Sequence, residues 1–136
     1  MYKRQSLDKA KAYAKSLNLE VEFTGKLSKS EWTNKAKDYN IFINTTNFDN
    51  MPVSVIEAMA LGLPVISTNV GGMPYLINAN KDGILVPPNN AHAFVKAILK
   101  VKNNTSKANS LAIEARKKVE KYDWEVVKTQ WESILK

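Results

Sequence analysis

The chain of 136 residues has no cysteine and a single histidine. The absence of cysteine excludes disulfides and thiolate metal sites. One histidine offers too few ligands for a metal site of the usual kind, so we expect no metal cofactor. No stretch approaches the roughly 20 apolar residues that a membrane-spanning helix needs, and no signal-peptide pattern opens the chain. Together these absences favour a cytoplasmic protein.

The middle of the chain has no excess of charge, although the whole chain carries a net charge of +7. Residues 1–40 hold nine Lys and Arg against five Asp and Glu, residues 41–100 hold three against three, and residues 101–136 hold eight against five. A nucleic-acid-binding protein usually concentrates positive charge on its recognition element, so we expect no nucleic-acid partner. We interpret the excess as solvated helix faces, or alternatively as a surface for peripheral association with the inner face of an anionic membrane.

The composition is that of a globular domain, with 44% hydrophobic and 24% charged residues. A chain of this length is long enough for one hydrophobic core. Residues 1–5 show no periodicity, and we interpret Met1–Gln5 as a non-native leader. We assign residues 6–136 to one domain, whose first helix is expected to begin with Ser6 as its N-cap.

Residues 40–76 organise the rest of the chain. Their pattern predicts, in order, strand Ile41–Asn44, a polar loop, a helix that opens at Pro52 and stops at Gly62, strand Pro64–Ser67 and the pair Gly71–Gly72. Open parallel sheets bind ligands beyond the carboxyl ends of their strands, and the free N–H groups at the start of a helix suit a phosphate. We therefore predict a nucleotide-type ligand at this place.

The residues on either side of this segment predict further strands and helices. Strands are expected at Leu19–Phe23 and Gly83–Val86, and helices after the caps Ser28, Asn90 and Asp123. Ser28 and Glu31 have the spacing of a capping box. The three tryptophans fall in capped helices, and we interpret them as packing residues. Strands that alternate with helices favour a parallel α/β sheet.

Residues 19–136 resemble the C-terminal, nucleotide-sugar-binding half of a GT-B glycosyltransferase of family 4. The segments V-E-F-T-G-K-L, E-A-M-A-L-G-L-P-V-I-S-T-N-V-G-G and G-I-L-V-P-P carry the resemblance and occur in the family's order. It implies an incomplete Rossmann-like parallel sheet of about four strands, flanked by helices, as half of a GT-B fold. It also implies a retaining transferase in glycan or polysaccharide biosynthesis. Such an enzyme moves a sugar from a nucleotide-diphosphate donor, of UDP or GDP type, to an acceptor hydroxyl without a required metal.

The family marks its donor site with two glutamates separated by seven residues. Glu57 matches the second, and Asp49 takes the place of the first. By resemblance, Glu57 accepts hydrogen bonds from the ribose hydroxyls, Asp49 faces the hydroxyls of the donor sugar, and the two are the candidate catalytic residues. The alternatives are a surface helix acid for Glu57 and an Asx-turn residue for Asp49.

The entry to the helix departs from the family, because Asn50-Met51-Pro52 replaces Gly-Phe-Gly. We expect the amides of Val53 and Ser54, aided by the helix dipole, to hold the diphosphate. Gly71 and Gly72 permit a close backbone approach and would form a second wall, the alternative being a plain turn. The predicted donor-binding residues are Asp49, Asn50, Met51, Pro52, Val53, Ser54, Glu57, Gly71 and Gly72.

A complete domain of this kind has six strands in the order 3-2-1-4-5-6. By resemblance, strands 1 and 2, a basic phosphate clamp and the acceptor-binding N-terminal domain are missing here. We expect Leu19–Phe23 either to pair directly with Ile41–Asn44 or to dock loosely. We also expect the 136 residues alone to transfer no sugar. The alternative functions are a non-catalytic nucleotide or nucleotide-sugar binding module, and an α/β interaction domain.

Overall fold

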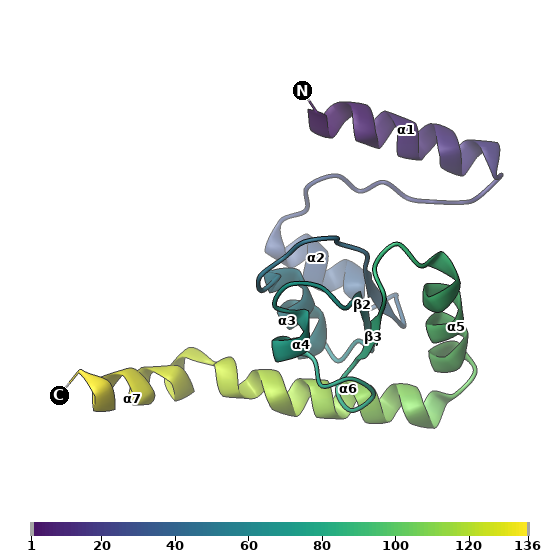
Figure 1. Ribbon diagram of the computed structural model, residues 1–136. Coiled ribbons are helices and arrows are strands. Elements are labelled where there is room, and N and C mark those ends of the chain that lie inside the picture. Colours follow the sequence, from purple (N-terminus) through teal and green to yellow (C-terminus); the bar gives the residue numbers. More distant parts are fainter. Residues whose placement is uncertain (1, 136) are drawn as a thin grey trace. The chain divides into compact units, whose positions relative to one another are not determined.

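The computed structural model describes residues 2–135, and the chain divides into two compact units, residues 1–32 and 33–136 (Figure 1). The larger unit contains a three-stranded parallel sheet in the order β1-β2-β3. Its strands are β1 Phe42–Asn44, β2 Val65–Thr68 and β3 Ile84–Val86. Phe42 pairs with Val65 and Ile66 with Ile84. The predicted α/β fold with a parallel sheet flanked by helices is confirmed, with three strands in the described residues instead of about four.

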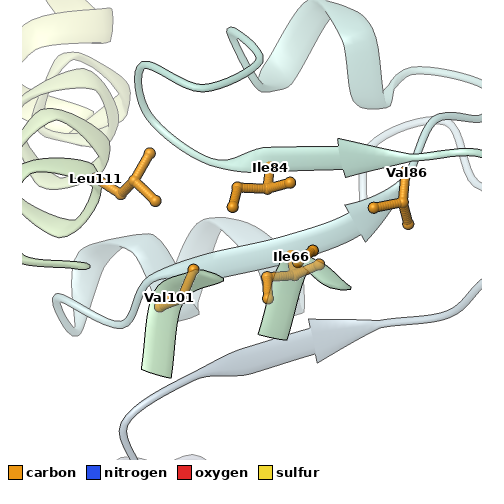
Figure 2. Packing of buried hydrophobic residues seen from close by; sticks show 6 residues of the cluster. Ile66, Ile84, Val86, Val101 and Leu111 are labelled. Atoms are coloured by element: carbon orange, nitrogen blue, oxygen red, sulfur yellow. The ribbon is translucent and has the colours of Figure 1, made fainter. Parts of the chain in front are cut away.

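The core lies on the face of the sheet that α5 (Ala91–Lys102) and α6 (Thr105–Val119) cover. Ile66, Ile84 and Val86 from the strands meet Val101 and Leu111 from these helices (Figure 2). All four residues of β2 are buried, as expected for a central parallel strand that packs on both faces. Because β2 is buried on both faces, its position is fixed, and so is the point at the edge of the sheet where the loop after β2 begins.

The helix starts of the larger unit follow the predicted caps. The side chain of Asn90 accepts a hydrogen bond from the amide of Ala93 at the start of α5, and Asn104 does the same for α6. Asp123 caps α7 (Trp124–Ile134), which follows the 3-10 turn η1 (Glu120–Tyr122). Each cap satisfies an amide that the helix itself leaves free. The predicted caps Asn90 and Asp123 are confirmed, and the cap at Asn104 was not predicted.

The prediction that the tryptophans are packing residues is wrong for α7. Trp124 is 64% exposed and Trp131 is 54% exposed, and none of the residues of α7 is buried. Within the described residues the apolar stripe of this helix is not buried, and Val127 alone is half-buried. An amphipathic pattern shows that a helix has an apolar face, but it does not supply the partner.

The smaller unit begins with α1 (Tyr2–Ser16), five residues earlier than a helix capped by Ser6 would begin. Ser6 therefore lies inside the helix and cannot be its N-cap. The helix ends at Ser16. Asn18 in the turn that follows has a φ of +50°, and the amide of Leu19 donates to the carbonyl of Ala14 at 3.0 Å. Met1 lies outside the described residues, and the interpretation of residues 1–5 as a leader stays a prediction.

The predicted strand Leu19–Phe23 is wrong, because these residues belong to none of the three strands. Leu19, Val21 and Phe23 are 56%, 49% and 36% exposed. A strand exists only where a neighbour pairs with its amides and carbonyls. The capping box that follows is confirmed: Glu31 accepts from the amide of Ser28 at 2.8 Å, at the start of α2 (Lys29–Ala36).

Candidate functional site

The predicted site residues lie at the carboxyl end of the sheet. The loop after β1, residues 45–52, leads into α3 (Val53–Ala60), and the loop after β2, residues 69–72, leads into the short helix α4 (Met73–Leu76) (Figure 1). We call residues 45–52 the β1–α3 loop. Because the strands are parallel, both loops leave the sheet at the same edge, where open α/β sheets bind ligands.

The glycine pair brings these two loops into contact. The amide of Gly72 donates to the carbonyl of Asp49 at 3.0 Å. A Cβ on Gly71 would lie 2.0 Å from the carbonyl oxygen of Asp49, and a Cβ on Gly72 would lie 1.4 Å from that of Asn50. Gly71 also has a φ of +51°. The pair therefore serves a close approach between two backbones that no other residue type permits.

The start of α3 presents free amides beside this contact. Pro52 is the residue before the helix, with φ −69° and ψ 117°, and its carbonyl accepts from the amides of Val55 and Ile56 at 3.1 and 3.4 Å. Within the described residues, the amides of Val53 and Ser54 donate no hydrogen bond. The positive end of the helix dipole lies at the same place. This end of α3 can accept an anionic group.

The two acids lie on either side of the helix start. Asp49 is half-buried in the β1–α3 loop, and Glu57 is half-buried in the second turn of α3. Glu57 follows Val53 by four positions, so the two share one face of the helix. An Asx turn at Asp49 needs its carboxylate to accept a nearby backbone amide. No such bond occurs in the described part of the chain, and this alternative is wrong.

Sequence reasoning missed the polar groups that anchor the loop to β2. The hydroxyl of Thr68 donates to the carbonyl of Thr46, and the side-chain amide of Asn44 donates to the hydroxyl of Ser67 at 3.1 Å. Ser67 and Thr68 are buried although both are polar. The signal that could have revealed them is the Ser-Thr pair at the end of the otherwise apolar strand V-I-S-T, because buried hydroxyls need partners.

The opposite end of α3 is fixed by α6. The guanidinium of Arg116 donates to the carbonyl of Ala60, the last residue of α3, and its Nε donates to Glu120 at 3.1 Å. A cation at this place complements both the free carbonyls and the negative end of the helix dipole. The helix that carries Glu57 is therefore held at its carboxyl end by a separate element of the fold.

The electrostatics of the site come from acids and backbone dipoles. The two loops, residues 45–52 and 69–72, contain Asp49 but no Lys or Arg. Among the described residues, no group of three or more His, Cys, Asp or Glu side chains is placed to hold a metal ion. The same residues include no helix that is both long and apolar enough to cross a membrane. Within these two loops an anionic group would meet backbone amides and no basic side chain.

Comparison with known proteins shows a match over most of the chain. Residues 3–118 match the protein family described as glycosyl transferases group 1. A probable sucrose-phosphate synthase of Thermosipho melanesiensis is 39% identical over 125 residues, which cover 91% of this chain and 28% of that protein. The putative colanic acid biosynthesis glycosyltransferase WcaL of Escherichia coli is 35% identical over 91 residues, covering 65% and 22%. The chain thus spans about a quarter of the length of these relatives.

Solved structures show the same fold. Sucrose-phosphate synthase from Thermosynechococcus elongatus matches with a TM-score of 0.85 and 26% identity, covering 94% of this chain and 33% of that one. Anabaena HepE, solved with UDP and glucose, matches with a TM-score of 0.87 and 20% identity, covering 99% and 38%. The C-terminal domain of LpcC from Francisella tularensis matches with a TM-score of 0.76 and 18% identity, covering 88% and 64%. The fold is that of the C-terminal domain of GT-B glycosyltransferases.

Proposed function

The chain belongs to the glycosyl transferase group 1 family, and we propose that it is the donor-binding part of a retaining transferase of family 4. The observation that carries the proposal is the contact between Gly71–Gly72 and the backbone of Asp49–Asn50. It brings the residues predicted from separate parts of the sequence to one end of the sheet. The bound ligand in this proposal is a nucleotide-diphosphate sugar of UDP or GDP type. Anabaena HepE, which has the same fold, was solved with UDP and glucose.

Each predicted residue has a role in this proposal. Glu57 accepts hydrogen bonds from the ribose hydroxyls, and Asp49 faces the hydroxyls of the sugar. The amides of Val53 and Ser54 receive the diphosphate at the start of α3, because they have no partner in the described residues. Asn50, Met51 and Pro52 shape the entry to the helix, and the Gly71–Gly72 turn forms the opposite wall.

The chemistry that this chain contributes is electrostatic. Loss of the nucleotide diphosphate develops negative charge on the phosphates, and fixed N–H donors stabilise that charge more in the transition state than in the ground state. No Lys or Arg lies in the two loops. The proposal therefore places the basic clamp and the acceptor site in further parts of the enzyme, including an N-terminal domain, and the 136 residues alone transfer no sugar. In this proposal the reaction requires no metal. The enzyme works in the cytoplasm and takes part in glycan or polysaccharide biosynthesis.

Titration of the isotopically labelled chain with UDP and with GDP tests the donor site. We expect the amide signals of Val53, Ser54, Gly71 and Gly72 to shift. We expect Glu57→Gln to weaken binding by about tenfold, because neutral hydrogen bonds replace charge-assisted ones. Glu132→Gln removes the same charge from exposed α7 and should leave binding unchanged.

Two outcomes would contradict the proposal. In one, neither nucleotide shifts the four amides. In the other, the Glu57 and Glu132 variants bind equally well. Sugar transfer by the 136 residues alone would contradict the prediction that the chain is inactive by itself. If the chain binds nucleotide but a polypeptide completed with its upstream half transfers no sugar, the function is that of a non-catalytic binding module.

A further inference from the structure

We propose that the hydroxyl of Thr68 is a positioning group that orders the β1–α3 loop before a nucleotide arrives. This inference rests on the proposed function, because it explains how the loop that carries Asp49 keeps a binding conformation. Thr68 is the last residue of β2 and is 1% exposed. It does not touch the ligand in this proposal, and it acts through the backbone of Thr46.

The contact crosses from the sheet to the loop. The Thr68 hydroxyl donates to the carbonyl of Thr46. The hydroxyl of Thr46 in turn donates to the carbonyl of Phe48 at 3.0 Å, and its amide donates to the side-chain oxygen of Asn44 at 3.4 Å. A buried hydroxyl without a partner is costly, so the loop carbonyl and the strand hydroxyl satisfy each other.

The loop is thereby held at two points. Thr46 is bound to the end of β2, and the carbonyl of Asp49 accepts the amide of Gly72. The side chains on either side of Asp49 do not pack in the core: Phe48 is 78% exposed and Met51 is 55% exposed. The backbone is anchored although these side chains are solvated. This combination is what a binding loop on a rigid scaffold needs.

Anchoring affects affinity because ordering a loop costs conformational entropy. If the loop is already ordered in the folded protein, binding does not have to order it, and the affinity is higher. Thr68→Val keeps the shape of the side chain but leaves the carbonyl of Thr46 without its donor. Thr68→Ser keeps the hydroxyl but removes a buried methyl group. The two variants therefore separate positioning of the loop from packing of the core.

The test measures UDP affinity and amide exchange in both variants. We expect Thr68→Val to weaken UDP binding by about fivefold to tenfold, which matches the loss of one net hydrogen bond. Exchange at the amides of Thr46 and Gly72, without ligand, should accelerate by a similar factor. Thr68→Ser should bind UDP within about twofold of the unmodified chain, although its lost methyl lowers the thermal midpoint.

A matched control removes a hydroxyl far from the site. Thr129 of α7 donates to the carbonyl of Val126 at 2.8 Å, so Thr129→Val deletes the same kind of bond. It should change neither UDP affinity nor exchange at Thr46 and Gly72. Equal affinity and equal exchange in Thr68→Val and the unmodified chain would overturn the inference. So would a loss of affinity in Thr68→Ser as large as that in Thr68→Val, because affinity would then follow packing.

Failure of the proposed function gives a different result. If the unmodified chain binds neither UDP nor GDP, the proposed donor site is wrong. The proposed effect of loop order on nucleotide affinity is then wrong as well. The exchange measurement needs no ligand and still decides whether the Thr68 hydroxyl orders the loop. Accelerated exchange in Thr68→Val, together with no nucleotide binding, would leave Thr68 as a structural anchor alone.

Discussion

Two short segments, residues 19–23 and 64–67, have sequences that predict strands, but only the second forms one. In the first, Leu19, Val21 and Phe23 remain exposed and no strand forms. In the second, β2 is buried throughout and pairs with β1 on one side and β3 on the other. The two segments differ in whether adjacent strands pair with them, and not in whether their sequences favour a strand. A strand gains its hydrogen bonds and its packing only from adjacent strands and covering helices.

The same difference separates the candidate site from the periphery. The β1–α3 loop leaves the sheet at its carboxyl end, and contacts from Thr68 and Gly72 hold it there. In the segment after α1, the amide of Leu19 donates to the carbonyl of Ala14 at 3.0 Å, but the side chains of Leu19 and Val21 stay about half exposed. A functional loop can be exposed and still be ordered, provided that its backbone is bound to buried groups. Variants in the two regions should therefore have very different effects.

The largest effect is expected from truncation in β2. Ile66→Ala removes a fully buried side chain from the core (Figure 2), and we expect it to lower the free energy of unfolding by about 4 kcal/mol. Val21→Ala removes an exposed side chain and should change it by less than about 0.5 kcal/mol. Urea unfolding followed by circular dichroism measures both. A cost of more than about 2 kcal/mol for Val21→Ala would show that residues 19–23 are buried in solution.

An intermediate loss of stability is expected when a methyl group is added to Gly72. Gly72→Ala places a Cβ 1.4 Å from the carbonyl oxygen of Asn50, so the two loops must separate. We expect a loss of about 3 kcal/mol and no detectable UDP binding. Gly25→Ala is the matched control, because Gly25 has a φ of +67° with nothing within 4 Å of an added Cβ.

The control isolates backbone strain from collision. Gly25→Ala should lower the free energy of unfolding by only about 1 kcal/mol, which is the strain of a left-handed backbone conformation. It should bind UDP as the unmodified chain does. Unfolding curves and UDP titrations of the two variants give both quantities. If Gly72→Ala binds UDP normally, the contact between the loops is not required for the site, and the observation that carries the proposed function is lost.

The sequence predicted the elements that depend on local chemistry. The caps Asn90 and Asp123, the Ser28–Glu31 capping box and the central strands all form where they were expected. Such features are determined by residues a few positions apart. The pattern also predicted that Asp49, Glu57 and the glycine pair follow adjacent strands, and the structure places them after β1 and β2; their role in a site stays a prediction.

The rest depends on partners that a local pattern does not contain. The alternation in residues 19–23 and the apolar stripe of α7 each require a second surface, and a local pattern does not show whether one is present; residues 19–23 form no strand, and no residue of α7 is buried. The role of Thr68 was also hidden, because a hydroxyl at the end of a strand does not show which carbonyl it binds. Likewise, the glycine pair predicted a close approach, but the identity of the approaching backbone, Asp49–Asn50, came only from the tertiary structure.

The smallest effect is expected at the exposed start of α2, and it depends on pH. Hydrogen bonds from the hydroxyl and then the amide of Ser28 lower the pKa of Glu31 below its ordinary value. A carboxyl whose pKa is depressed by folding stabilises the folded state above its unfolded pKa. That contribution is lost as the pH falls through the folded pKa. We therefore expect the first turn of α2 to lose protection in acid.

Amide exchange at Trp32, whose N–H donates to the carbonyl of Ser28 at 2.9 Å, measures this loss. Protection, corrected for the intrinsic exchange rate, should fall modestly between about pH 6 and about pH 3. Glu31→Gln is the matched variant, because glutamine keeps the geometry of a capping box but does not titrate. Its protection should stay flat over the same range. An equal fall in both proteins would mean that another group, and not the Glu31 carboxylate, controls the stability of this helix start.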